Sequence, residues 1–183
     1  MTGVTGSGVG MLSSCWPEDG QPIAAPLELY RTSVREEWVD YNGHLSEWAY
    51  LQVFGDNSDA FFRFVGVNDA YREGGRSLYT AETHLRHLRE AKLGQGLNLT
   101  LQVLGFDSKR LHLLHRMYRG AECAATAEQL LLHVDTRAGR VIAFSDQLAD
   151  RLEQIASAHA QLGIPAFVGR TIQAPVGDAK RGS

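Results

Sequence analysis

The spacing of hydrophobic residues changes twice along the chain. Residues 27–34 alternate between apolar and polar, as a strand does, with Leu27 and Leu29 on one face and Tyr30 and Val34 on the other. From residue 45 to residue 65 the spacing becomes helical, and one apolar stripe predicts the buried face of a long helix. The stripe consists of Trp48, Leu51, Phe54, Ser58, Phe61, Phe62 and Val65.

Strand patterns dominate the next part of the chain. Apolar-rich runs at 77–91, 97–106, 110–118 and 123–134 predict strands. The short polar gaps at 94–96, 107–109 and 119–121 predict hairpin connections between them. One apolar helix needs a sheet to cover it, so this order predicts an α+β architecture in which a curved antiparallel β-sheet wraps around a long central helix.

The last part of this unit predicts a turn at 135–140, a short strand at 141–144 and a helix over 147–161. Ser145 and Asp146 can cap that helix, and Gly163 and Pro165 end it. Its inward positions are Leu148, Leu152, Ile155 and His159.

The two ends of the chain read as tails around one domain at 27–162. Residues 1–26 are dominated by Gly, Ser, Thr and Pro and predict a flexible N-terminal tail. Residues 163–183 predict a C-terminal tail. Because one sheet layer leaves an outer face or an edge open, we expect a homodimer or a homotetramer.

Composition narrows the function classes. The 183 residues are 44% hydrophobic and 21% charged, which argues against disorder. A net charge of −3 leaves no basic footprint for nucleic acid, and no apolar run approaches the roughly 18 residues of a membrane span. Cys15 and Cys123 cannot form a disulfide framework, and no secretory signal is apparent, so a cytoplasmic location is expected.

One segment carries a family resemblance. The run WVDYNGHL at 38–45, followed by YLQVF at 50–54, resembles the active-site entry of hotdog-fold acyl-CoA thioesterases of the 4-hydroxybenzoyl-CoA thioesterase type. The motif of that family, an Asp, a Gly three residues on and a Tyr near the start of the central helix, falls on Asp40, Gly43 and Tyr50. The resemblance covers about residues 27–152 and implies the hotdog fold and thioester hydrolysis.

Further segments resemble the thioesterases associated with carnitine dehydrogenase. They are DYNGHL at 40–45, YLQVFGD at 50–56, YTAETHLRHL at 79–88, KRLHL at 109–113 and AEQLLLHVD at 127–135. This closer resemblance implies hydrolysis of betainyl-CoA to glycine betaine and CoA in carnitine catabolism, with no cofactor beyond the CoA of the substrate. No dehydrogenase activity is expected, because the chain has no Gly-x-Gly-x-x-Gly segment.

The chemistry of a thioester assigns roles to the motif. Asp40, in a turn before the helix, can activate water as a general base or attack the carbonyl directly, although a carboxylate there can equally cap a helix. Gly43 lets a carbonyl oxygen approach the backbone N–H groups of Gly43 and His44, which would hold the growing negative charge. We expect the His44 side chain to orient the site and its N–H to take part in catalysis.

A cationic acyl group would need its own contacts. Glu47 can supply a carboxylate, or it can be a solvated residue of the first helical turn. Aromatic faces bind quaternary ammonium groups, and several aromatic side chains near the motif are candidates for such a cage. These are Trp38, Tyr41, Trp48, Tyr50 and Tyr79, of which Trp48 and Tyr50 also suit the core.

Basic residues on the predicted strands are candidates for binding the CoA phosphates. They are Arg86, Arg89, Lys92, Lys109 and Arg110. No metal site is expected, since His84 and His87, like His112 and His115, are three apart on strands and face opposite sides. Cys123 is expected to be a buried small residue.

Two other functions stay open at this point. The same chemistry could act on another short-chain or aromatic acyl-CoA, for which a buried carboxylate would have no use. Alternatively, a hotdog domain could bind acyl-CoA without hydrolysing it, and such a domain would not need Asp40.

Overall fold

The computed structural model describes residues 10–12, 15–18 and 20–172. The helical elements are η1 (Glu36–Trp38), α1 (Glu47–Val65), α2 (Asp69–Glu73), α3 (Asp146–His159) and η2 (Ala160–Leu162). The strands are β1 (Gly10–Met11), β2 (Leu27–Ser33), β3 (Arg76–His87), β4 (Gly96–Phe106), β5 (Arg110–Arg119), β6 (Glu122–Asp135) and β7 (Arg140–Val141). The predicted α+β architecture is confirmed.

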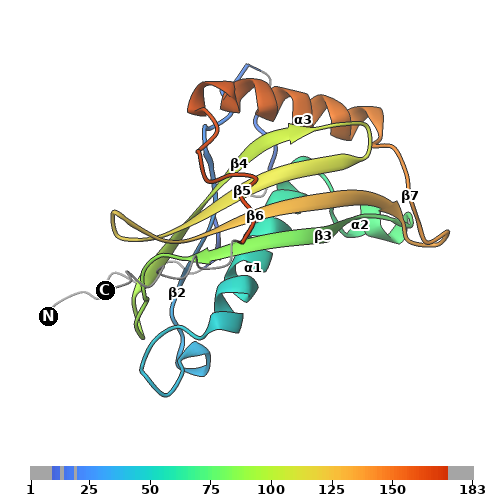
Figure 1. The fold of residues 1–183 in the computed structure, drawn as a ribbon. Coiled ribbons are helices and arrows are strands. Elements are labelled where there is room, and N and C mark those ends of the chain that lie inside the picture. Colours follow the sequence, from blue (N-terminus) through green and yellow to red (C-terminus); the bar gives the residue numbers. More distant parts are fainter. Residues whose placement is uncertain (1–9, 13–14, 19, 173–183) are drawn as a thin grey trace, which may run out of the picture.

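The strands form one antiparallel sheet in the order β1-β2-β4-β5-β6-β3, with β7 beside β6. Figure 1 shows α1 lying across one face of this curved sheet and α3 running along β4. The chain after α3 crosses the opposite face of the sheet (Figure 1). The long helix is therefore held in the hollow of the sheet, as the apolar pattern predicted.

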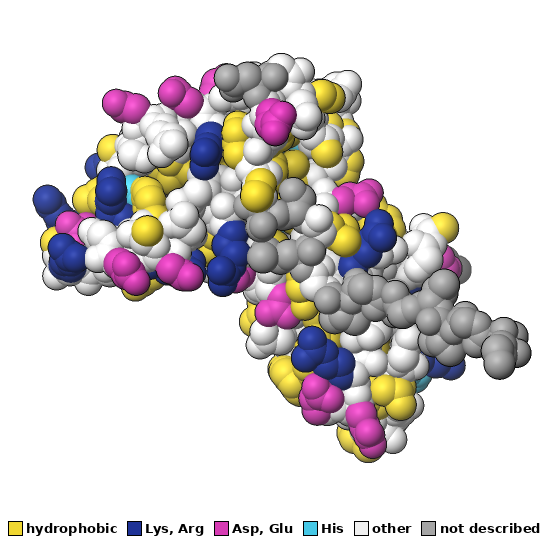
Figure 2. All heavy atoms as spheres, turned by 180° about the vertical axis from the view of Figure 1, so that it is seen from behind, with side chains coloured by type: hydrophobic (Ala, Val, Ile, Leu, Met, Phe, Trp, Pro, Cys, Tyr) yellow, Lys and Arg dark blue, Asp and Glu magenta, His cyan; other side chains and the backbone are white. Residues whose placement is uncertain are grey.

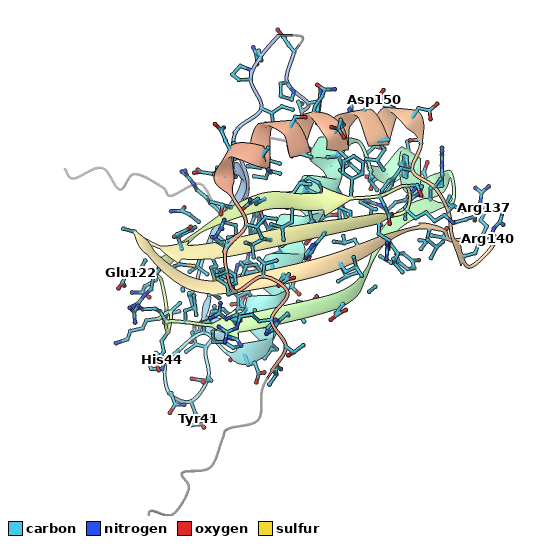
Figure 3. The ribbon with its side chains drawn as sticks, turned by 45° about the horizontal axis from the view of Figure 1, so that its top comes forward. Tyr41, His44, Glu122, Arg137, Arg140 and Asp150 are labelled. Carbon is cyan, nitrogen blue, oxygen red and sulfur yellow. The ribbon has the colours of Figure 1, made fainter. Side chains whose placement is uncertain are left out.

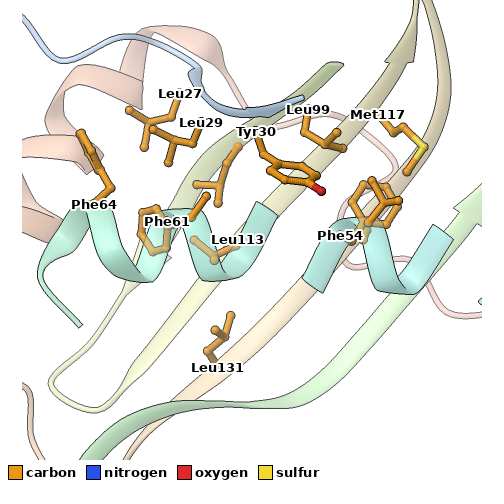
Figure 4. Packing of buried hydrophobic residues seen from close by; sticks show 14 of the residues in the cluster. Leu27, Leu29, Tyr30, Phe54, Phe61, Phe64, Leu99, Leu113, Met117 and Leu131 are labelled. Atoms are coloured by element: carbon orange, nitrogen blue, oxygen red, sulfur yellow. The ribbon is translucent and has the colours of Figure 1, made fainter. Parts of the chain in front are cut away.

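The core forms where α1 meets the sheet. Phe54 and Phe61 on α1 are fully buried, as are Leu113 on β5 and Leu131 on β6 (Figure 4). Burying one such side chain is worth about 1.5–3 kcal/mol, so this contact is a main source of stability.

The predicted buried stripe of α1 is partly wrong. Trp48 is 56% exposed and Leu51 is 49% exposed, whereas Ala49 and Val53 are fully buried. The helix has apolar residues on two faces, and the face that carries Val53 and Phe54 packs against the sheet. The second face stays open in the single chain.

The two ends of α1 have local causes. The helix begins at Glu47, two residues later than the helical spacing suggests, because Leu45 pairs with Val39 in a short antiparallel bridge. It ends at Gly66, whose backbone is left-handed with a φ of 94°, a conformation that glycine adopts without strain. The short helix α2, which the sequence pattern did not reveal, follows at once and is capped by the side chain of Asn68.

One predicted connection is wrong. Residues 94–96 do not form a hairpin, because β3 pairs with β6 at the edge of the sheet while β4 pairs with β2 and β5. The predicted hairpins at 107–109 and near 120 are confirmed. The strand predicted for 77–91 ends at His87, and the segment that follows it passes beside the start of α1.

The described part of the N-terminal tail is packed on the domain. Gly10 pairs with Arg31, the Trp16 ring lies 5.2 Å from that of Phe64, and the Ala24 carbonyl accepts a hydrogen bond of 3.1 Å from His159 Nε2. These contacts hold Gly10, Trp16 and Ala24 against the domain, and the flexible tail stays a prediction; residues 1–9, 13–14 and 19 lie outside the described residues.

The C-terminal tail behaves in the same way up to residue 172. The Gly169 N–H donates to the Glu128 carboxylate at 3.0 Å, and the Gly163 carbonyl accepts from Gln102 at 2.8 Å. Both contacts hold this segment against the sheet. Residues 173–183 lie outside the described residues.

Candidate active site

A tight loop precedes α1 and carries the predicted catalytic motif. The Asp40 N–H donates to the His44 carbonyl at 2.9 Å, and the Gly43 N–H donates to the Asp40 carbonyl at 3.0 Å. Gly43 has a φ of 77°, which a residue with a Cβ adopts only with strain. The spacing of Asp40 and Gly43 is therefore required by the turn as well as suited to catalysis.

The carboxylate of Asp40 is fixed within the same loop. Its Oδ1 accepts hydrogen bonds from the Asn42 N–H at 2.8 Å and the His44 N–H at 3.3 Å. Such a turn, closed by an Asp side chain, orients the carboxyl group. Among the described residues, Oδ2 has no hydrogen-bond partner, so this oxygen is available to a bound molecule.

The segment after β3 forms the second wall of the site. The Leu45 N–H donates to the Ala91 carbonyl at 2.7 Å, and the Tyr50 hydroxyl donates to the Arg89 carbonyl at 3.2 Å. The Tyr50 ring meets His87 edge-on at 4.7 Å, and burial raises the pKa of the Tyr50 hydroxyl. Tyr50 thus joins the first turns of α1 to the end of β3.

Between these walls lies a cavity of about 570 Å³. It is lined by Asp40, Asn42, His44, Leu45, Glu47, Tyr50, His87, Leu88, Arg89 and Glu90. Figure 3 shows His44 and Tyr41 at one end of the molecule, away from Arg137 and Arg140 at the other. The structure brings Asp40, His44 and Glu47 together around one open pocket.

The predicted aromatic cage is not assembled in the single chain. Trp38 and Trp48 line a different hollow, with Tyr30, Arg35 and Asp56 among its other members. The Arg35 guanidinium already covers the Trp38 ring at 4.5 Å from its centroid.

The other aromatic candidates are also separated from the cavity. Tyr41 is 96% exposed, and Tyr79 lies on the exposed part of β3, eight positions before His87. Of the aromatic set, only Tyr50 lines the Asp40 pocket. These residues were grouped because they lie near the motif in the sequence. In the structure they lie in two different hollows or on the exposed surface.

The predicted CoA-binding residues lie in three places. Arg89 lines the cavity, and the backbone of Lys92 forms an isolated antiparallel β-bridge with that of His44. Arg86, on β3, lies over the Phe167 ring. Lys109 and Arg110 lie at the other end of the sheet: Arg110 is opposite Leu132 of β6, whereas His87 is opposite Ala125, roughly 23 Å along the strand.

Charge elsewhere on the molecule is mixed. On the described part of the face seen in Figure 2, Lys and Arg side chains are interspersed with Asp and Glu. Arg110 contacts Asp107 at 2.6 Å, and backbone N–H donors together with Arg110 lower the pKa of that carboxyl to about 2. Lys109 and Arg110 are therefore not part of one phosphate-binding cluster with Arg89 in the single chain.

Five lining residues had no role in the sequence-based expectation. Asn42 and Leu45 lie in or next to the loop, and His87, Leu88 and Glu90 enter the site because the end of β3 and the segment after it lie beside that loop. Glu90 stands between Arg89 and Lys92, two predicted CoA-binding residues, and its position in the sequence gave no other signal.

The described residues contain no group of three or more His, Cys, Asp and Glu residues arranged to hold a metal. Within that same part of the chain, no helix is long and apolar enough to cross a membrane.

Comparison with known proteins identifies the class. A helix held in a curved antiparallel sheet, with an Asp loop before the helix, is the arrangement expected for hotdog thioesterases. The family model described as the thioesterase-like superfamily matches residues 34–152, and the chain belongs to this family. A candidate thioesterase from Pseudomonas putida, solved by crystallography, has a TM-score of 0.73 at 37% identity and covers 84% of this chain and 99% of its own. The hotdog fold is confirmed.

Two curated relatives are more specific. An L-carnitine dehydrogenase/betainyl-CoA thioesterase from Rhizobium meliloti is 47% identical over 164 residues, which is 86% of this chain. The matched region is only 33% of the length of that relative. A betainyl-CoA thioesterase from Pseudomonas aeruginosa is 41% identical over 152 residues, covering 81% of this chain and 96% of its own length.

Proposed function

We propose that this protein is an acyl-CoA thioesterase that hydrolyses betainyl-CoA to glycine betaine and CoA, as a step of carnitine catabolism. The observation that carries the proposal is the Asp40 loop opening on a cavity of about 570 Å³, in a chain 41% identical to a betainyl-CoA thioesterase that it covers almost completely. The reaction adds water across the C–S bond, so it needs a base or nucleophile and a proton for the sulfur, and no resident cofactor.

Asp40 supplies the base or the nucleophile in this proposal. Its fixed Oδ1 leaves Oδ2 to take a proton from water or to attack the thioester carbonyl, which would give a mixed anhydride that water then hydrolyses. General base catalysis is worth roughly 10²–10⁴ in rate. Both routes end in the same products.

The backbone of Gly43 and His44 is assigned to the thioester oxygen. Both N–H groups bond within the loop, Gly43 to the Asp40 carbonyl at 3.0 Å and His44 to Asp40 Oδ1 at 3.3 Å. The His44 bond is the longer, so this donor is the one a bound carbonyl oxygen would take over. One such donor is typically worth about 10²–10³ in rate.

Glu47 is proposed to select a cationic acyl group. It lines the same cavity as Asp40, and because Glu90 is paired with His44, these two carboxylates share the cavity with one arginine, Arg89. This surplus of negative charge suits a trimethylammonium group better than a neutral acyl chain. Trp38, Tyr41, Trp48 and Tyr79 contribute to the acyl site only if a partner subunit completes it.

Arg89 and Lys92 are proposed to hold the CoA phosphates at the mouth of this cavity, whereas Arg86, which lies over the Phe167 ring, would contribute only from another subunit. A CoA-bound protein from Staphylococcus aureus has a TM-score of 0.74 at 25% identity and covers 85% of this chain. Lys109 and Arg110 would reach CoA only from another subunit. We further infer a cytoplasmic location, where CoA thioesters are made and used.

A homodimer or homotetramer is part of the proposal. β3 is the edge strand of the sheet and pairs only with β6 among the described strands, although it runs from Arg76 to His87. An exposed edge of this length favours pairing with a second copy. Light scattering of the purified protein tests this: a monomer mass would contradict it.

The experiment that tests the function compares CoA thiol release from betainyl-, acetyl-, butyryl- and benzoyl-CoA. A preference of about 100-fold or more for betainyl-CoA supports the proposal. Equal rates over the panel would favour a thioesterase for other short or aromatic acyl groups. Binding of CoA thioesters without turnover would favour a non-catalytic acyl-CoA-binding domain.

A further inference from the structure

The cavity contains a pair of side chains that the reaction above does not use. His44 Nε2 lies 3.2 Å from Glu90 Oε2, and both residues line the cavity together with Asp40. His44 comes from the loop before α1 and Glu90 from the segment after β3, so the pair joins the two walls of the site.

The backbone holds these two residues in register. His44 is bridged to Lys92, and the neighbouring Leu45 N–H donates to the Ala91 carbonyl at 2.7 Å. These two backbone contacts hold the loop beside the segment after β3, and they place the His44 imidazole within reach of Glu90. Although the Glu90 side chain is 68% exposed, the His44 side chain is only 26% exposed.

The contact at Nε2 determines what the other ring nitrogen can do. Among the described residues, Nδ1 of His44 has no hydrogen-bond partner. A carboxylate beside one nitrogen of an imidazole orients the ring and attracts its cationic form, which leaves the other nitrogen to transfer a proton. The pair is thus suited to a proton transfer at Nδ1.

We propose that His44 is the proton donor to the departing sulfur and that Glu90 is its positioning residue. This inference rests on the proposed thioesterase function. As the C–S bond breaks, sulfur leaves with the bonding electrons and takes the proton from Nδ1, which gives the CoA thiol and a neutral imidazole. The imidazole regains a proton from the water consumed in the reaction, through Asp40 if Asp40 is the base.

The same role fits both routes open to Asp40. In the nucleophilic route, the water that cleaves the mixed anhydride returns the proton to His44. In either route one water is consumed, one carboxylic acid and one thiol are formed, and His44 and Glu90 end as they began.

Substitutions can distinguish a role of the His44–Glu90 pair in proton transfer from a purely structural contact between the two walls of the site. Glu90→Gln keeps an oxygen near Nε2 but removes the charge, and a substitution at a side chain that is 68% exposed should not impair folding. Glu37→Gln is the matched control, because Glu37 is similarly exposed at 64%, pairs with Arg35 at 3.9 Å and does not line the cavity.

The experiment measures kcat and KM for CoA thiol release from betainyl-CoA, with and without added imidazole. We expect Glu90→Gln to lower kcat about 10- to 100-fold with KM within about 3-fold, and His44→Ala to lower kcat about 10²- to 10⁴-fold. Imidazole should restore the kcat of His44→Ala by about 10-fold or more, and restore less when Glu90→Gln is also present. Glu37→Gln should match the unsubstituted protein.

This inference would be overturned if Glu90→Gln left kcat unchanged, or if added imidazole did not restore the kcat lost in His44→Ala. The pair would then only hold the loop against the segment after β3. The proposed function would survive that result, because Asp40→Asn would still abolish turnover. Absence of hydrolysis by the unsubstituted protein would instead contradict the proposed function itself.

Discussion

Asp40 and His44 hold each other in place through two hydrogen bonds that run in opposite directions. The Asp40 N–H donates to the His44 carbonyl at 2.9 Å, and the His44 N–H donates to Asp40 Oδ1 at 3.3 Å. One oxygen of the carboxylate is thereby committed to the loop and the other is left for chemistry. In the proposed mechanism, the loop thus orients the Asp40 carboxylate before any substrate arrives.

The first prediction concerns Asp40→Asn. The amide oxygen can still accept from Asn42 and His44, so the loop should persist while the base or nucleophile is lost. We expect kcat for betainyl-CoA to fall by about 10³-fold or more, measured as CoA thiol release. Asp150→Asn, on the exposed side of α3 and far from the loop in Figure 3, is the control and should retain full activity.

The second prediction concerns Glu47→Gln and substrate choice. Loss of this carboxylate should lower kcat/KM for betainyl-CoA about 3- to 10-fold, which corresponds to roughly 0.7–1.4 kcal/mol for one partly solvated charge contact. The value for butyryl-CoA, which has no charge on its acyl group, should stay within about 2-fold. An equal loss for both substrates would remove Glu47 from cation recognition.

The third prediction compares two residues of α1. Phe54→Ala should lower the free energy of unfolding by about 3–5 kcal/mol, because Phe54 is fully buried against the sheet. Leu51→Ala should cost less than about 1 kcal/mol in the single chain, since Leu51 is 49% exposed. Urea unfolding at one protein concentration measures both. A larger cost for Leu51 would place that face of α1 in a subunit interface.

The fourth prediction concerns acid stability. Burial lowers the pKa of His115 to about 4, and burial also lowers the pKa values of His133 and His159. The unfolded chain binds protons at these residues near pH 6.5, so proton uptake favours unfolding. Stability is therefore retained above about pH 6.5 and decreases as the pH falls from there toward 4.

For His115 alone, the linked loss between pH 7 and pH 5 is about 2 kcal/mol. His115 Nδ1 accepts a hydrogen bond of 2.9 Å from the Asn57 side-chain amide in the core, and His115→Gln keeps a polar group there without a titration. Urea unfolding at the two pH values should show a smaller difference for His115→Gln. An equal difference in both proteins would contradict the assignment to His115.

The sequence was most informative where short-range rules apply. The Asp40 turn, the long helix, the two hairpins and the inward positions of α3 follow from local spacing, and the structure has Leu148, Leu152, Ile155 and His159 buried. The catalytic assignment of Asp40 and Gly43 came from the family resemblance, and it stays a prediction.

Long-range pairing set the limits of what could be predicted. Consecutive strands are neighbours only about two-thirds of the time, and β3 is an exception that pairs with β6 instead of β4. That choice brings Glu90 beside His44. Similarly, spacing alone cannot tell which of two apolar faces of α1 meets the sheet, so Trp48 and Leu51 were placed in the core when they are exposed.

The most direct test of the account is the rate of CoA thiol release from betainyl-CoA by the unsubstituted protein and by Asp40→Asn, with butyryl-CoA alongside. The account predicts hydrolysis of betainyl-CoA at least about 100-fold more efficient than that of butyryl-CoA, and its loss in Asp40→Asn. An Asp40→Asn protein that hydrolyses betainyl-CoA as fast as the unsubstituted protein would contradict it.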